Sequence, residues 1–345
     1  MPRSAQKKPN VRDVARHARV SVATVSRVLN GSPLVSAATR QQVEGAIEAL
    51  RFVPSSAARA INSGHTRLVG ALIPTLDYSI FARFIEAVES GLDRKGLSLI
   101  VATTAHDAAR ELDRARKLLD IGVEGLIVSG ITRAHGFDAL VSRHQVPVVA
   151  TSYFKADHTV PTIGYDNALL ARTALDHLTS LGHREIAVLS GPSEMSDRTR
   201  ARLSGLDGAG PATQHRFEME LSFSAAGVIT RKVVSEFPRV SALLCLSDVL
   251  AQGALLQLRS EGIDVPSEIS VVGMDNLPAS ESFAPPLTTI KLPVEEMGET
   301  TAEAIASWIE TGEMPTSRLL EMELMVRGTT ATARPALDQG SPNES

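Results

Sequence analysis

Residues 11–30 read VRDVARHARVSVATVSRVLN and predict two short helices joined by a tight turn. Asn10 can cap the first helix, because its side chain accepts backbone N–H groups at a helix start. Ser21 can cap the second helix in the same way, and this helix is expected to run to Asn30. Its inner and close-packed positions are Ala23, Val25, Val28 and Leu29. Its outward positions are Val22, Thr24, Ser26 and Arg27.

A third helix is expected after Ser36, and Pro54 ends it because proline cannot continue a helix. Its apolar residues repeat at helical spacing: Val43, Ala46, Ile47 and Leu50. Two short helices braced by a third predict a helix-turn-helix domain, whose second helix suits a DNA major groove. There Arg27 can reach a guanine or a phosphate. Phosphate contacts are expected from Ser21, Thr24, Ser26 and Asn30. A generic three-helix bundle is the alternative.

The charge of the chain is unevenly distributed. Residues 1–67 hold 11 Lys and Arg but only three Asp and Glu, whereas the remainder holds 24 against 36. A basic N-terminal part on an acidic body predicts a nucleic-acid partner for that part, because positive charge attracts the phosphate backbone. A solvated helical surface that is basic without function is the other interpretation.

The motif from Val11 to Asn30 closely resembles the N-terminal signature of the LacI/GalR family of transcription regulators, and within it the galactose- and ribose-repressor branch. The resemblance continues through Val35-Ser36, Thr39-Arg40, Val43 and Phe52-Val53-Pro54. It implies that Val22 and Ala23 help to choose the operator and that Arg27 reads a base. The set expected at the DNA is completed in this domain by Val11, Arg12, Ser36 and Thr39.

Residues 55–66 are expected to form a hinge. Ser55 can cap a helix of about two turns, which is too short to be stable without a partner helix or DNA. A plain linker is the alternative. The segment resembles the family's hinge helix, which packs against a second copy in the minor groove. The resemblance implies that Ile61 wedges between base pairs and that Ala58 is its small neighbour, although leucine is the usual wedge.

From Leu68 onward, apolar strand-like segments alternate with helix-like ones. Strands are expected at 68–73, 97–102, 125–129, 146–149, 186–189, 242–246 and 269–272, and helices at 81–95 and 108–121. Repeated strand–helix units with apolar strands predict parallel sheets with helices on both faces. About 270 residues exceed one such sheet, so two lobes are expected.

Polar residues that directly follow the expected strands predict a ligand crevice, because ligands bind at the carboxyl ends of parallel strands. These residues are Asp77, Ser129, Ser152, Ser247, Asp248, Asp275 and Asn276. Together with Arg202 and the ring of Phe81 they suit a small polar ligand. Asp248 and Asp275 could instead be helix caps or loop residues, and Phe81 could belong to the core.

This body resembles the periplasmic-binding-protein fold of the LacI/GalR regulators. The resemblance rests on 122–128, 166–167, 181–187, Arg202 with Gly205, 246–248, 269–276 and 286–290. It implies that Arg202 and Asp275 hold the effector and that Phe81 stacks on it. Ser247 and Ser152 stand where the family often has Asn and Asp, and 204–216 is short and glycine-rich. These departures argue against a standard hexose.

The sequence therefore predicts an all-α helix-turn-helix domain (1–54), a hinge (55–66), a two-lobed α/β effector-binding and dimerisation domain (67–330) and a disordered tail (331–345). The expected function is a homodimeric transcription regulator, most simply a repressor, that binds a pseudo-palindromic double-stranded DNA operator under control of a small molecule such as a sugar or related metabolite. The tail lacks the leucine heptads of a tetramerising coiled coil.

The same residues argue against two other classes of protein, a transport protein and an enzyme. A free sugar-binding transport protein needs an export signal, which residues 1–10 do not resemble, so a cytoplasmic protein is expected. An enzyme is not expected, because the known nucleotide, nucleophile and metal motifs are missing, although Asp248 and Asp275 could form an acid–base pair. No cofactor, metal, membrane or disulfide is expected, since Cys245 is the single cysteine. An activator, or a regulator with a protein co-effector, stays open.

Overall fold

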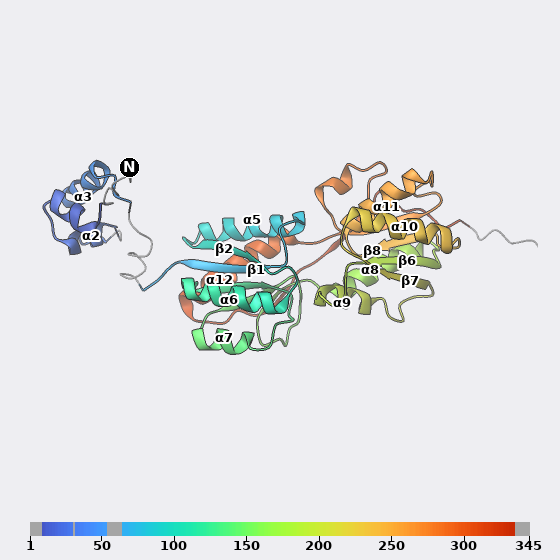
Figure 1. Cartoon of the computed structure of the whole chain (residues 1–345), viewed down its shortest axis with the longest axis horizontal. Coiled ribbons are helices and arrows are strands. Elements are labelled where there is room, and N and C mark those ends of the chain that lie inside the picture. Colours follow the sequence, from blue (N-terminus) through green and yellow to red (C-terminus); the bar gives the residue numbers. More distant parts are fainter. Residues whose placement is uncertain (1–8, 30–31, 54–63, 335–345) are drawn as a thin grey trace, which may run out of the picture. The chain divides into compact units, whose positions relative to one another are not determined.

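The computed structural model describes residues 9–29, 32–53 and 64–334, and the chain divides into two compact units (Figure 1). These are Met1–Arg67, here called the head, and Leu68–Ser345, here called the body. Asn30, the hinge residues Ser55, Ala58 and Ile61, and residues 335–345 of the predicted tail lie outside the described residues. The expectation that disorder begins at 331 is wrong, because Ala331 donates to Ser270 Oγ at 3.1 Å and Ala333 donates to the Leu181 carbonyl at 2.8 Å. In the part of the chain that is described, no helix is long and apolar enough to span a membrane.

The three helices predicted in the head are confirmed. They are α1 (Val11–His17), α2 (Val22–Leu29) and α3 (Ala37–Ala49). Asn10 caps α1 by accepting the backbone N–H groups of Arg12 and Asp13, and the Asp13 carboxylate accepts the Asn10 N–H in return. Ser36 caps α3 through the N–H of Thr39. Each helix thus begins where its capping side chain satisfies otherwise unpaired donors.

A small apolar core holds the head together. Its fully buried centre consists of Val14, Val25 and Val43, one from each helix, so every helix depends on the other two. Arg40 of α3 also donates 2.8 Å to the backbone oxygen of Ser32, just beyond α2. A unit of this size buries little apolar surface and has a narrow margin of stability.

The body contains two six-stranded sheets of the same topology. The first has the order β11-β5-β4-β3-β1-β2 and the second β12-β10-β9-β8-β6-β7. The first sheet comprises β1 (Leu68–Ile73), β2 (Ser98–Thr103), β3 (Gly125–Ser129), β4 (Val148–Thr151), β5 (Thr162–Gly164) and β11 (Arg318–Leu319). The second sheet comprises β6 (Glu185–Ser190), β7 (Thr213–Glu218), β8 (Ala242–Cys245), β9 (Ser270–Asp275), β10 (Thr288–Lys291) and β12 (Glu323–Met325). All pairs are parallel except β10 with β12.

Helices cover both faces of each sheet, and each sheet with its helices is called a lobe here (Figure 1). The first lobe carries α5 (Ser79–Asp93), α6 (Ala108–Ile121), α7 (Phe137–His144) and α12 (Val294–Thr311). The second carries α8 (Asn167–Ser180), α9 (Asp197–Gly205), α10 (Phe223–Glu236), α11 (Asp248–Ser260) and the short η1 (Pro278–Glu281). The predicted two-lobed α/β body is confirmed.

The seven strands predicted in the body are found within three residues of their observed bounds, because each is an apolar run. Strands β5, β10, β11 and β12 were not predicted, and neither was β7. Strand β7 reads TQHRFE and lies at the edge of its sheet, where one side has no neighbouring strand to demand apolar residues. The chain passes between the lobes after β5, after β10 and again between β11 and β12.

Candidate functional site

The outward face of α2 is the candidate DNA-reading surface of the head. Val25 and Val28 are buried against the core, while Val22, Ala23 and Arg27 are exposed. The expectation that Ala23 packs inward is wrong, because the 100° step of an α-helix places it opposite Val25 and Val28. The exposed position agrees with the other expectation for Ala23, a place among the residues that meet DNA.

The remaining DNA-contact candidates that the structure describes gather at helix starts. Ser21 Oγ accepts the Thr24 N–H at 3.1 Å and lies 2.9 Å from the Thr24 hydroxyl. Ser36 and Thr39 repeat this arrangement at the start of α3, with the same hydroxyl separation of 2.9 Å. Helix starts carry partial positive charge and suit phosphate groups. Of the others, Arg12 is exposed, and Val11 and Ser26 are partly buried.

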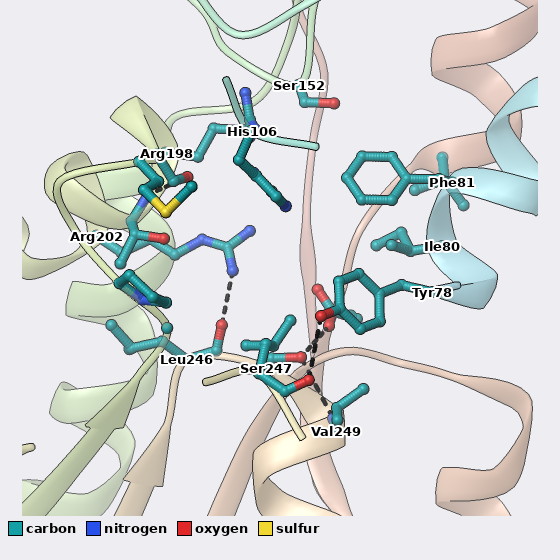
Figure 2. A pocket seen from close by; sticks show the side chains of 18 of the residues that line it. Tyr78, Ile80, Phe81, His106, Ser152, Arg198, Arg202, Leu246, Ser247 and Val249 are labelled. Carbon is teal, nitrogen blue, oxygen red and sulfur yellow. Dashed lines mark hydrogen bonds between the residues drawn. The ribbon is translucent and has the colours of Figure 1, made fainter. Parts of the chain in front are cut away.

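A cavity of about 240 Å³ lies between the lobes of the body, at the carboxyl ends of both sheets. The segments after β2, β4, β6, β8 and β9 all contribute to its lining. Figure 2 shows Tyr78, Ile80 and Phe81 on one side and Arg198 and Arg202 on the other. The topology therefore puts the candidate ligand site where parallel sheets place one.

Five of the predicted effector residues line this cavity: Phe81, Ser152, Arg202, Ser247 and Asp275. Three of them form one polar group. Ser247 Oγ donates to the Asp275 carboxylate at 2.9 Å. Burial raises the pKa of Asp275, and the positive charge of Arg202 offsets part of that rise. Arg202 is held by bonds to Asn167 Oδ1 (3.1 Å) and the Leu246 carbonyl (2.7 Å), and its guanidinium points into the cavity (Figure 2).

Backbone conformation also marks this cavity. His106, Ser152 and Asp275 line it with φ angles of 60°, 63° and 117°, a region that side chains disfavour. Such conformations persist where surrounding structure enforces them, and they cluster at ligand sites. At Ser152 the enforcement is visible, since its carbonyl accepts the Asn167 amide at 3.0 Å.

Apolar side chains form most of the cavity wall. They include Ile80, Phe84, Leu221, Val249, Leu277, Val294 and Met297. The rings of Tyr78 and Phe81 lie 6.5 Å apart, tilted by 39°. The cavity thus offers apolar and aromatic surface beside several polar side chains, which suits a small molecule with both kinds of surface.

Four of the residues predicted for the ligand crevice do not line this cavity. Asp77 is exposed and accepts the Thr75 hydroxyl at 3.0 Å. Ser129 lines a neighbouring cavity of about 110 Å³, and its hydroxyl has no hydrogen-bond partner within the described residues. Asp248 is fully buried beneath the lining. Asn276, the neighbour of Asp275, bonds instead to Arg327 at 2.8 Å.

Asp248 has a structural environment that explains its absence from the lining. Its carboxylate accepts the Leu277 N–H (2.8 Å) and the hydroxyls of Ser280 and Thr289 (both 2.6 Å). Burial, followed by the nearby charge of Asp275, raises the pKa of Asp248 to about 7. The side chain therefore joins α11 to β10 and η1 below the cavity floor.

Tyr78, His106, Arg198 and Glu220 also line the cavity and were not among the predicted site residues. Arg198 had a sequence signal, because it precedes Arg202 by four residues, one helical turn, on α9. Tyr78 lies between the predicted Asp77 and Phe81, and His106 follows β2 by three residues, so both had a positional signal. Glu220 follows β7, a strand that was not predicted.

Comparison with protein families identifies both units. Residues 10–55 match the family of bacterial regulatory proteins, lacI family. Residues 175–330 match a periplasmic binding protein-like domain, which covers most of the second lobe and part of the first.

Known relatives match nearly the whole chain. The HTH-type transcriptional regulator reg1 of Streptomyces lividans is 34% identical and MalR of Streptomyces coelicolor 33%, each alignment covering 93% of this chain and 96% of the relative. The repressor CytR of Escherichia coli K12 is 28% identical over the same shares. The lac repressor dimer bound to operator and the anti-inducer ONPF superposes with a TM-score of 0.85 at 28% identity, over 94% of this chain and 100% of that one. The regulator CelR in complex with cellobiose gives a TM-score of 0.67 at 28% identity, over 93% and 99%.

Proposed function

Because the chain belongs to the LacI family of bacterial regulatory proteins, we propose that it binds a two-fold DNA operator through α2 and changes its operator affinity when a small molecule fills the cavity. The observation that carries the proposal is the combination of an exposed α2 face in a basic head with a cavity bordered by strained, polar residues in the body. Repression is the simplest output, since several relatives are named repressors.

The DNA-binding half of the proposal rests on α2. Eight residues make a helix about 12 Å long, which fits a major groove of about that width. Val22 and Ala23 can approach base edges closely because they are small, and Arg27 can donate two bonds to a guanine. We propose that two copies of the chain present two such helices to the half-sites of a pseudo-palindrome.

The effector half rests on Arg202, Ser247 and Asp275. They supply donors and acceptors for hydroxyl or amide groups, while Tyr78 and Phe81 offer a surface for an apolar face. We propose a sugar or a related small metabolite as effector. CelR binds cellobiose in its solved complex, which supports this chemical class. Binding without turnover is proposed, so the protein is not an enzyme, and its place is with the chromosome in the cytoplasm.

Selection from a random duplex library tests the DNA-binding proposal. The purified full-length protein is used at one stated salt concentration, because affinity for DNA depends steeply on salt. Recovery of one enriched two-fold site supports the proposal. Recovery of random sequences, with binding that vanishes at moderate salt, contradicts it.

Thermal melting with a panel of monosaccharides, disaccharides and nucleosides tests the effector proposal. A compound that occupies the cavity raises the melting temperature of the body, since it binds only the folded state. The same compound should not change the melting temperature of the Arg202→Ala variant. A shift that persists in Arg202→Ala would place the compound elsewhere.

A further inference from the structure

One carboxylate of the second lobe is bound by the backbone of the first. Asp197, the first residue of α9, accepts the N–H groups of Ile131 and Thr132 at 2.6 and 2.8 Å through Oδ2. Arg200, one turn further on, donates to the Thr132 hydroxyl at 3.2 Å. Ile131 and Thr132 directly follow β3 of the first lobe, so these bonds cross between the lobes.

This contact is surrounded by two buried ion pairs, one in each lobe. Asp197 pairs with Arg198 at 3.1 Å, and Glu111 pairs with Arg133 at 3.5 Å, and all four side chains are at most 12% exposed. Burial by itself raises the pKa of Asp197, but Arg198 and the two N–H groups outweigh it and hold the pKa below its usual value. Buried charges of this kind are tolerated only while they stay paired.

Gly130 leaves room for the carboxylate. Its φ is +74°, and a Cβ at this position would overlap both Asp197 carboxylate oxygens and the Arg198 guanidinium. The first lobe therefore receives Asp197 in a backbone recess that a side chain would fill.

Arg198 connects this contact to the effector cavity. It lines the main cavity with its neighbour Ser196, and it also lines the smaller cavity together with Asp197. A molecule in the main cavity would therefore contact the start of α9, the helix whose first residue is Asp197. Other bonds between the lobes are single: Tyr78 donates to the Leu221 carbonyl at 3.1 Å, Arg83 to the Asn276 carbonyl at 3.3 Å, and Asn167 to the Ser152 carbonyl at 3.0 Å.

We propose that Asp197 is the residue that holds the two lobes in their closed arrangement, through the backbone of 130–132, and that Arg198 transmits occupancy of the cavity to this contact. Asp197 acts as a positioning residue and does not itself line the main cavity. This role of Asp197 concerns the body alone. It can therefore be wrong while operator selection succeeds, and it can be right while operator selection fails.

Pulsed electron spin resonance on the full-length protein tests it. Spin labels are attached at Ser142→Cys on α7 and Ser204→Cys on α9, both exposed and in different lobes. The native Cys245 is fully buried and should not be labelled. Labelled chains are diluted into unlabelled protein so that the distance within one chain dominates.

Three test variants and one control variant are compared in this background. Asp197→Ala should give a longer and broader distance distribution than the parent, and Asp197→Asn an intermediate one, because asparagine keeps an acceptor and loses the charge. Gly130→Ala should reproduce the Asp197→Ala result from the opposite lobe. Asp207→Ala, which removes an exposed carboxylate of the same lobe paired with Arg216, should match the parent.

The melting temperature of each variant is recorded alongside. If Asp197→Ala and Gly130→Ala melt as folded proteins and keep the parental distance distribution, Asp197 does not hold the lobes closed and the proposal is wrong. A lower melting temperature without a change of distance would likewise assign Asp197 a purely structural role. Opening in Asp197→Ala but not in Gly130→Ala would overturn the assignment of the 130–132 backbone as its partner.

Discussion

The DNA-facing surface of α2 consists of neighbours in the sequence, whereas the cavity draws its lining from Tyr78 at one extreme to Met297 at the other. Single substitutions on α2 change one contact with DNA and leave the other residues in place. Substitutions in the cavity act on a site that two sheets and several loops must assemble first. The head should therefore respond to mutation one side chain at a time, and the body through its networks.

Removing Arg27 should produce the largest change. Arg27→Ala loses its contacts to a base and is expected to weaken binding to the selected operator about 5- to 150-fold, corresponding to about 1–3 kcal/mol. Arg16→Ala is the matched control, because Arg16 is an exposed head arginine on α1 and its loss changes the charge equally. Fluorescence anisotropy at one salt concentration measures both. Equal losses would mean that α2 contributes only charge.

Removing Arg202 should give a change of comparable size, and it should affect ligand binding rather than the DNA surface. Arg202→Ala leaves the buried Asp275 without its positive neighbour and removes a charged donor, an effect of about 1.5–3 kcal/mol. Ligand affinity is expected to fall roughly 10- to 150-fold. Arg202→Lys should recover only part, since lysine cannot make both fixed bonds. Calorimetry with a compound from the melting panel measures this. If Arg202→Ala binds the compound as tightly as the parent does, the compound does not bind at Arg202.

A core substitution in the head separates the stabilities of the two units. Val43 is fully buried between the helices, and Val43→Ala should cost about 2 kcal/mol. In so small a unit that loss lowers the melting temperature of the head by several degrees, while the body should melt as before. Calorimetric scanning resolves the two transitions. A matching shift of the body would show that the units do not unfold independently.

The smallest expected effect is the pH dependence of the body. Folding raises the pKa of Asp248 from an ordinary value near 3.8 to about 7, and burial raises that of Asp275 as well, so the folded state favours their protonated forms. This contribution to stability is complete below about pH 4 and is lost as the pH rises through about 7.

Asp248→Asn removes most of that pH dependence. Relative to the parent, its free energy of unfolding should therefore improve as the pH rises from about 4 to about 7 and then level off, on top of a constant loss from the replaced acceptor. Asp207→Asn, an exposed change of equal charge, should show no such trend. Urea unfolding at several pH values measures the difference, and a flat difference for Asp248→Asn contradicts the assignment.

The same contrast explains what the sequence could predict. The helices of the head are local: Asn10, Ser21 and Ser36 cap them, and apolar spacing orients them. Only Ala23 was placed on the wrong face, because alanine is common on both faces of a helix. Seven strands of the body were predicted because each is an apolar run, and polar β7 was missed for the opposite reason. The short strands β5, β11 and β12 and the threonine-rich β10 were also missed.

The cavity could be predicted only in part. Ser152, Ser247 and Asp275 directly follow or end strands, so the rule for parallel sheets finds them. The same rule also selected Asp248, whose carboxylate turns down to Ser280 and Thr289, and sequence spacing cannot show that direction. The partners of Asp197 lie 65 residues away on another sheet, and a pairing of that kind depends on the tertiary fold.

Operator affinity in the presence of a compound that binds the cavity tests the central claim most directly. The compound is one that raises the melting temperature of the parent but not of Arg202→Ala, and the duplex is the one recovered by selection. A coupled regulator should change its operator affinity about 5- to 150-fold when the compound is added, and Arg202→Ala should not respond. If the compound binds the parent and leaves its operator affinity unchanged, the cavity does not control the DNA-binding head.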